Sequence, residues 1–242
     1  TGWDNGSDTI TINGVDAGGE VITGPNIHKT SIFGKSGNDN ITGGSGNDTV
    51  NGGDGDDTMD GGGGTNTITL SAAGTTTGGT GIETYNLAAG TNVFNSANGG
   101  QTVVGNTGAD TITGGTGNDQ LSGNGGDDVL SGGLGNDTIT GGKGVDTIYG
   151  GAGNDTLVDF GDSTIYGGEG NDIFNRADND PESDGTYGLI LYGEEGNDSF
   201  NYLQNVKIID AGTGDDEVAI LGNGTASPTS CLLYTSRAHE TG

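Results

Sequence analysis

Aspartate recurs at intervals of nine residues along much of this chain. In the stretch GGLGNDTITGGKGVDTIYGGAGNDTLV, from Gly132 to Val158, Asp137, Asp146 and Asp155 follow one another at this spacing. Each lies in a phrase G-G-x-G-x-D-x-U-x, where U is a large apolar residue. A carboxylate repeated in register with glycine-rich backbone, which approaches its neighbours closely, offers carboxylate and carbonyl oxygens as ligands. The pattern therefore favours binding of hard divalent cations.

Many copies of the phrase share this spacing, which indicates a repeat architecture. Uninterrupted copies begin at Gly34, Gly43 and Gly52, and again at Gly105, Gly114, Gly123, Gly132, Gly141 and Gly150. A degenerate copy begins at Gly61, isolated copies begin at Gly167, Gly193 and Ala211, and a partial copy covers residues 3–11. The acids in the sixth place are Asp8, Asp39, Asp48, Asp57, Asp110, Asp119, Asp128, Asp137, Asp146, Asp155, Asp172, Asp198 and Asp216, and all of them except Asp8 are candidate metal ligands.

Each phrase predicts a turn followed by a short strand. Glycine in the first, second and fourth places permits positive φ and close approach of neighbouring chain. The last three residues, such as Thr138-Ile139-Thr140, favour extended structure with the middle side chain facing inward. Two phrases then make one flattened coil of eighteen residues, stacked along an axis. The predicted inward set is Ile41, Val50, Met59, Ile68, Ile112, Leu121, Leu130, Ile139, Ile148, Leu157, Phe174, Phe200 and Val218.

The composition argues that the coil needs a counter-charge. The chain has 34 acidic and 6 basic residues, a net charge of -28 and 28% hydrophobic residues, as is usual for a disordered acidic spacer. Stacked turns lie about 4.8 Å apart, where two carboxylates repel by roughly 3 kcal/mol at an effective dielectric of 20. Calcium, which tolerates irregular oxygen coordination better than magnesium, is predicted to remove this repulsion and supply folding energy.

The same charge excludes several function classes. Phosphates of nucleic acids and anionic membrane surfaces would be repelled, and no apolar run is long enough for a membrane span. No G-x-S-x-G or H-E-x-x-H motif occurs, so we expect no enzyme activity in these residues and place any catalytic domain outside them.

The repeated phrase resembles the RTX (repeats-in-toxin, haemolysin-type) calcium-binding nonapeptide over most of residues 34–69 and 105–219. The resemblance implies an all-β fold: a parallel β-roll, or β-solenoid, with two short-stranded parallel sheets. It also implies several Ca²⁺ ions between successive coils, with Asp119, Asp137 and Asp155 along one edge. Asp110, Asp128 and Asp146 would line the other. The glycines whose carbonyls it implies as further ligands are Gly114, Gly115, Gly117, Gly132, Gly133, Gly135, Gly141, Gly142, Gly144, Gly150, Gly151 and Gly153.

Some stretches depart from the pattern. Asn66 and Glu83 stand where aspartate is expected, and the phrase is blurred between residues 70 and 104. After Asp155 the spacing changes, and strands at 163–166, 189–192 and 206–209 are predicted to serve as opposite half-coils. We expect one edge to keep its calcium column to Asp216 and the other to lose it after Asp146.

These observations predict six segments. They are a partial repeat and entry segment at 1–33, a calcium-binding block at 34–69, ion-poor coils at 70–104, a second calcium-binding block at 105–158, an irregular roll with calcium on one edge at 159–222, and a disordered tail at 223–242. Residues 231–242 resemble a translated sequencing adapter rather than natural protein, and the alternative is a C-terminal secretion signal. The chain is interpreted as a fragment of a longer protein.

The predicted function is that of a monomeric calcium-binding module of a larger secreted bacterial protein. The resemblance implies type I secretion in an unfolded state and calcium-triggered folding and stability outside the cell. One alternative is a carbohydrate- or surface-binding adhesin module that uses Tyr149, Tyr166, Tyr187 and Tyr192. Another is the C-terminal part of a secreted hydrolase or toxin.

Overall fold

The computed structural model describes residues 9–15, 18–26, 29–55, 57–62, 65–70, 75–77, 82–96, 99–176, 189–201, 206–219 and 232–234. Asp8 and Tyr187 lie outside these ranges. The regular elements in the described part of the chain are all β-strands, and no helix there is suited to crossing a membrane.

The strands form two faces of a coil, one of which is a single twelve-stranded parallel sheet. In spatial order this sheet contains β1 (Thr9–Asn13), β3 (Lys29–Ser36), β5 (Thr49–Asp54), β7 (Thr65–Thr69), β9 (Ile82–Asn86), β11 (Thr102–Val104), β13 (Gln120–Gly125), β15 (Thr138–Lys143), β17 (Thr156–Asp159), β19 (Ile173–Arg176), β21 (Ser199–Asn201) and β23 (Glu217–Ala219).

The opposite face is divided into two parallel sheets. The three-stranded sheet contains β2 (Val21–Thr23), β4 (Asn40–Thr42) and β6 (Thr58–Asp60). The nine-stranded sheet contains β8 (Thr75–Thr77), β10 (Val93–Asn95), β12 (Thr111–Thr116), β14 (Val129–Leu134), β16 (Thr147–Ala152), β18 (Thr164–Glu169), β20 (Leu189–Glu195), β22 (Val206–Asp210) and β24 (Leu232–Tyr234). β6 packs beside β8 where the two sheets meet. The prediction of a parallel β-solenoid is thus confirmed, with one face interrupted.

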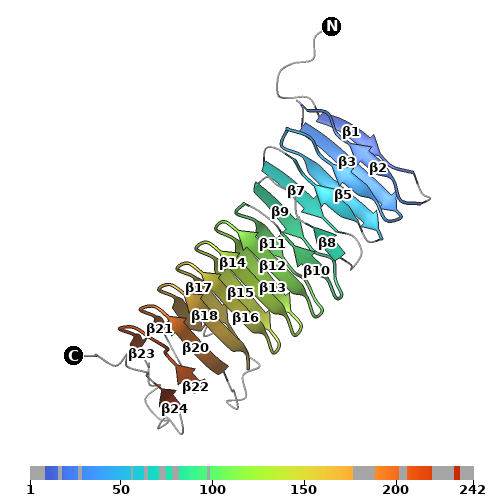
Figure 1. Cartoon of the computed structure of the whole chain (residues 1–242). Coiled ribbons are helices and arrows are strands. Elements are labelled where there is room, and N and C mark those ends of the chain that lie inside the picture. The colour runs from blue at the N-terminus through green and yellow to red at the C-terminus, as the bar shows by residue number, and fades with distance from the viewer. Residues whose placement is uncertain are drawn as a thin grey trace.

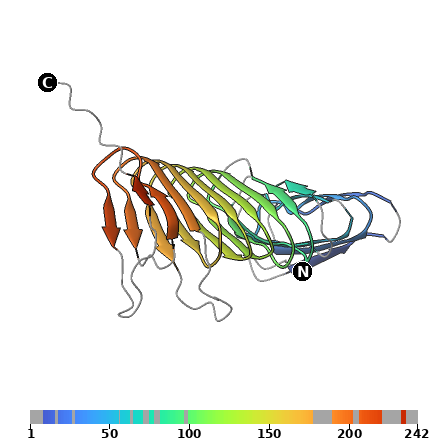
Figure 2. The ribbon, with the colours of Figure 1, turned by 90° about the horizontal axis from the view of Figure 1, so that it is seen from below.

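Successive strands alternate between the two faces, so the chain winds as a flattened coil. Figure 1 shows the strands stacked along one long axis, with β1 near one end and β23 near the other. Figure 2 shows the coils surrounding a narrow interior. In the regular part, Thr111 pairs with Val129 and Thr138 with Thr156, so each coil returns after eighteen residues.

The interior is one apolar column, because period two turns the middle residue of each short strand inward. On the nine-stranded face, Ile112, Leu130 and Ile148 lie in register, and all three are fully buried. All members of the predicted inward set are buried except Val218, which is partly buried. Stacking neighbouring coils therefore buries side chains that a single coil would leave exposed.

The blurred repeats between residues 82 and 104 continue the same coil. Tyr85 of β9 and Phe94 of β10 meet across the interior with ring centroids 4.5 Å apart. Both rings are fully buried. Larger aromatic side chains therefore fill the core in this part of the roll.

The tail differs from the prediction of disorder at one place. Leu232–Tyr234 form β24, which pairs in parallel with β22. An apolar tripeptide added to the open edge of a sheet satisfies backbone groups that the edge would leave exposed. The other residues of the tail after Ala219 lie outside the described ranges.

Candidate metal sites

Two glycines with positive φ shape most of the turns. In the phrase that begins at Gly132, Gly133 and Gly135 have φ angles of 108° and 129°. A β-carbon on either residue would collide with the carbonyl oxygen of Gly115 or Gly117 in the preceding coil. Carbonyl oxygens of the second and fourth glycines therefore face the next coil at close range, in a backbone conformation that glycine adopts most readily.

The first glycine of the phrase lets a carboxylate oxygen and a carbonyl oxygen approach its backbone closely. A β-carbon on Gly132 would collide with Asp137 Oδ2 and lie 2.7 Å from the carbonyl oxygen of Gly150 in the next coil. The same pair of neighbours, an aspartate Oδ2 and the first-glycine carbonyl of the next coil, surrounds Gly34, Gly43, Gly105, Gly114, Gly123, Gly150 and Gly167. A carboxylate oxygen and a carbonyl oxygen from successive coils thus face one space.

The aspartates before the strands of the twelve-stranded sheet form a first ladder. The backbone N–H of Asp119 donates to Asp137 Oδ1, and that of Asp137 donates to Asp155 Oδ1, both at 2.8 Å. The same hydrogen bond joins Asp155 to Asp172, Asp172 to Asp198 and Asp198 to Asp216. The ladder is therefore continuous, although these pairs are 17, 26 and 18 residues apart in the sequence.

The turns at the opposite edge form a second ladder. The N–H of Asp110 donates to Asp128 Oδ1 at 2.7 Å, and the N–H of Asp128 donates to Asp146 Oδ1 at 2.9 Å. The next acceptor is Ser163 Oγ, which receives the N–H of Asp146 at 2.8 Å. A hydroxyl therefore replaces the carboxylate after Asp146, at the place where the sequence predicted the loss of this column.

The N-terminal block has the same hydrogen bonds. Asp39 donates its N–H to Asp57 Oδ1 at 2.9 Å, and Asp48 donates to Asn66 Oδ1 at 2.8 Å. Asn66 thus occupies the aspartate position without its charge.

Both ladders of the second block begin at a residue that is not aspartate. The backbone N–H of Asn92 donates to Asp110 Oδ1 in the second ladder, and the backbone N–H of Gln101 donates to Asp119 Oδ1 in the first.

The ladders satisfy only one oxygen of each carboxylate. The Oδ2 atoms of nine aspartates in the described residues are buried and have no hydrogen-bond partner: Asp39, Asp48, Asp119, Asp128, Asp137, Asp146, Asp155, Asp172 and Asp198. An orphaned buried carboxylate oxygen is costly unless a cation or proton is provided. Its repetition, always beside glycine, indicates a shared ligand rather than a local defect.

Burial perturbs the carboxylates of eight aspartates in the ladders, as expected for charges without a counter-ion. Loss of solvation is the main cause that raises the pKa of Asp119, Asp172 and Asp198 to about 6, and that of Asp146 and Asp155 to about 7. Neighbouring carboxylates add to the rise; for Asp155 they are Asp172 and Asp137. Burial also raises the pKa of Asp48, Asp128 and Asp137. The ionised ladder is therefore destabilising until a cation neutralises it.

The donor set fits calcium. In the described part of the chain no three His, Cys, Asp or Glu side chains cluster as a metal site, so an ion in these turns needs backbone carbonyls as well as carboxylates. Carboxylate and carbonyl oxygens in a flexible arrangement are the ligands that calcium accepts. Asp57, Asp110 and Asp216, also predicted as ligands, occupy ladder positions through their Oδ1 atoms.

A further ladder, formed by the fifth residue of the phrase, was not anticipated. The N–H of Asn136 donates to Asn118 Oδ1, and that of Asn154 to Asn136 Oδ1, both at 2.8 Å. These bonds run toward the preceding coil, opposite to the aspartate bonds. The recurring pair Asn-Asp in the sequence was the available signal. The exposed asparagines thereby hold successive turns in register beside the buried carboxylates.

Comparison with known protein families agrees with this geometry. The model of the RTX calcium-binding nonapeptide repeat matches in four copies, at residues 33–68, 95–130, 122–157 and 159–180, which together cover half of the chain. A search among curated proteins gave no match. The third copy contains Asp128, Asp137, Asp146 and Asp155, the central members of both ladders. The chain therefore belongs to the family of proteins with RTX calcium-binding nonapeptide repeats, and its repeats form the β-roll described above.

Proposed function

We propose that this chain is a folding and stabilising module of a larger secreted bacterial protein, in which calcium binding between coils drives formation of the roll. The observation that carries the proposal is the row of buried, unpartnered aspartate Oδ2 atoms beside glycine carbonyls. Each bound ion would neutralise carboxylates and bridge neighbouring coils. Folding and calcium binding then become one equilibrium.

Export in an unfolded state is consistent with this coupling. A chain that lacks folding energy without calcium stays extended where calcium is scarce and folds where it is abundant. Extracellular calcium modules have dissociation constants on the order of 10⁻⁴ to 10⁻³ M, which suits such a switch. The only cysteine is Cys231, so residues 1–230 are stabilised without disulfides.

Circular dichroism of the purified chain tests the proposal. We expect a disordered spectrum in EGTA and a β-sheet spectrum in millimolar calcium, with no comparable change in magnesium or in sodium chloride of equal ionic strength. The salt control separates specific coordination from screening of the net charge. Identical spectra in EGTA and calcium would reject the proposal.

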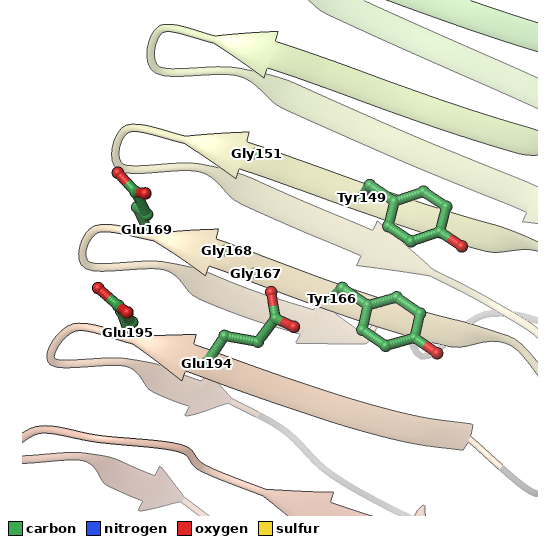
Figure 3. A pocket seen from close by; sticks show the side chains of 8 residues that line it. All are labelled: Tyr149, Gly151, Tyr166, Gly167, Gly168, Glu169, Glu194 and Glu195. Atoms are coloured by element: carbon green, nitrogen blue, oxygen red, sulfur yellow. The ribbon is translucent and has the colours of Figure 1, made fainter.

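A second candidate function is carbohydrate binding on the nine-stranded face. Tyr149, Tyr166 and Tyr192 stack in register, with centroid distances of 5.0 and 4.9 Å and interplanar angles of 8° and 7°. Tyr149 and Tyr166 border an open groove of about 400 Å³ that Glu169 and Glu194 also line, and Figure 3 shows the Glu194 carboxylate beside Tyr166.

The groove has features that favour neutral or basic glycans over acidic ones. Glu194 has a φ of 71° at a position where the preceding strand has Gly168, so the backbone accepts strain to place an acid there. Its carboxylate would repel acidic polysaccharides. Tyr149 is 42% exposed and ends the ring stack next to Ser131.

A glycan array probed in calcium tests this candidate, with Tyr149→Ser as the matched variant because serine occupies the aligned position in β14. Loss of a glycan signal in the variant would support the candidate. The absence of any signal for the parent chain, or an equal signal for both proteins, would reject it.

A further inference from the structure

One turn of the second ladder has an amide at the ladder position. Asn92 stands in the sixth place of its phrase, where most copies have aspartate, and it is 1% exposed. Its backbone N–H donates to Asp110 Oδ1 at 2.8 Å, as the aspartates of the second ladder donate to their neighbours. The turn therefore keeps the hydrogen bond between coils but contributes no carboxylate of its own.

The amide nitrogen of Asn92 faces three oxygens. Nδ2 lies 2.9 Å from the carbonyl oxygen of Ala88, 2.8 Å from that of Gly90 and 2.8 Å from Asp110 Oδ1. Ala88 and Gly90 hold the second and fourth places of the phrase, and Asp110 belongs to the next coil. The two N–H groups of one amide thus reach carbonyl and carboxylate oxygens of successive coils.

This arrangement satisfies a carboxylate that the regular turns leave with one orphaned oxygen. Asp110 Oδ1 accepts the backbone and side-chain N–H groups of Asn92, and Asp110 Oδ2 accepts the N–H of Asn106 at 3.4 Å. In the next two members of the ladder, Asp128 and Asp146, Oδ2 is buried and has no hydrogen-bond partner. Donors of the chain itself therefore meet the oxygens that elsewhere need a cation.

The backbone of this turn also departs from the regular phrase. Gly90 has a φ of 108°, but alanine replaces the second glycine. In the described part of the chain, the residues other than glycine with positive φ are Lys35, Asn124 and Glu194. Ala88 therefore lacks the positive φ that directs the second carbonyl in the regular turns. The residues of this turn do not fit a cation as those of the regular turns do.

We infer that the side-chain amide of Asn92 takes the position of a bound cation and closes its turn without metal. The coil between the calcium-binding blocks predicted at 34–69 and 105–158 is then joined to the second block by hydrogen bonds. The Tyr85–Phe94 contact in the interior of the same coil adds apolar stabilisation that is also independent of calcium. The inference rests on the proposed function, since it takes the regular turns to bind calcium.

Replacement of Asn92 by aspartate in the full chain tests the inference. Asn92→Asp removes the amide donors and places a second carboxylate beside Asp110. In EGTA with the stabilising osmolyte trimethylamine N-oxide, the ratio of folded to unfolded chain should fall at least about tenfold, because three hydrogen bonds are lost and two carboxylates repel. In saturating calcium, the variant should bind one ion more than the parent chain and recover most of the lost stability.

Two further variants separate the causes. Asn92→Ala removes the donors without adding a charge, so it should be less stable than the parent chain in EGTA and in calcium alike, with no additional ion. Asn136→Asp adds a carboxylate at an exposed fifth place, where Asp127 serves as the acceptor in another phrase. It should leave the number of bound ions unchanged and alter the ratio of folded to unfolded chain by about twofold or less.

The outcomes distinguish this inference from the proposed function. If the parent chain binds calcium but Asn92→Asp is as stable as the parent in EGTA, only the inference is overturned. Equal stability of Asn92→Asp and Asn92→Ala in saturating calcium, with no added ion, would also overturn it. If the parent chain binds no calcium, the proposed function is wrong and the inference fails with it. Asn92→Ala decides the comparison in EGTA if Asn92→Asp does not fold there.

Discussion

Replacing Asp155 by asparagine should change the stability of the roll in opposite directions with and without calcium. Asp155 Oδ1 accepts the N–H of Asp137 at 2.8 Å. Asn66 accepts the N–H of Asp48 at the same distance, so an amide preserves this hydrogen bond. The substitution therefore removes the charge and leaves the ladder. The change in stability that this substitution causes therefore measures the electrostatic contribution of the Asp155 charge.

The expected magnitude follows from the neighbouring charges. Each adjacent carboxylate, one coil away, repels Asp155 by roughly 3 kcal/mol at about 4.8 Å and an effective dielectric of 20. Both Asp137 and Asp172 contribute to the raised pKa of Asp155. Relief of only about 1 kcal/mol of this repulsion would raise the ratio of folded to unfolded metal-free chain about fivefold.

The assay compares two conditions at pH 8, where the ladder is ionised. In EGTA, the variant should fold at a lower concentration of the stabilising osmolyte trimethylamine N-oxide than the parent chain does. In saturating calcium, it should bind at least one ion fewer and unfold at a lower temperature. Asp127→Asn is the matched control, because Asp127 is an exposed fifth-place acid whose Oδ1 accepts the N–H of Val145. A variant that is less stable than the parent chain in EGTA would refute the electrostatic reasoning.

Three other perturbations test separate parts of the account. In calcium-free buffer, the free energy of unfolding should be greatest below pH 4 and should fall as pH rises through 6 to 7, because burial raises the pKa of Asp146 and Asp155 to about 7. Calcium affinity should instead rise with pH over the same range. Melting temperatures measured at low and at high pH, with and without calcium, check both expectations. Gly135→Ala should raise the calcium concentration needed for folding, since its β-carbon would meet the carbonyl of Gly117 at a φ of 129°, whereas Lys143→Ala on an exposed site should not. Ile139→Ala should lower the free energy of unfolding by about 2 to 5 kcal/mol, because Ile139 is fully buried. Chemical denaturation curves recorded in saturating calcium measure this loss, and a value below about 0.5 kcal/mol would contradict the core assignment.

The regular part of the fold could be predicted from the sequence because each residue type has one task at one position. Ile112 and Leu130 face inward from strands with period two, and Asp128 and Asp146 recur in register with glycine. The repeat therefore determined the coil, its core and the order of the ladders. The change after Asp146 was also predictable from spacing.

Residues that take over or adjoin a ladder position without standing in the sixth place of the phrase could not be predicted in this way. Ser163 serves as a ladder acceptor, and Asp159 lies beside Asp146 although it stands outside the sixth place of the phrase. Recognising either residue requires knowing that the coil is one residue shorter there. Pairing of Leu232–Tyr234 with β22 likewise depends on an open sheet edge, which the local sequence does not reveal.

The central claim is that calcium bound between coils supplies the stability that this chain lacks. Small-angle scattering combined with direct measurement of bound calcium, over one titration at constant ionic strength, tests it most directly. In EGTA the radius of gyration should approach about 50 Å, as for an unfolded chain of this length, and it should fall in step with the number of bound ions. A compact, heat-resistant roll after exhaustive removal of calcium would contradict the account.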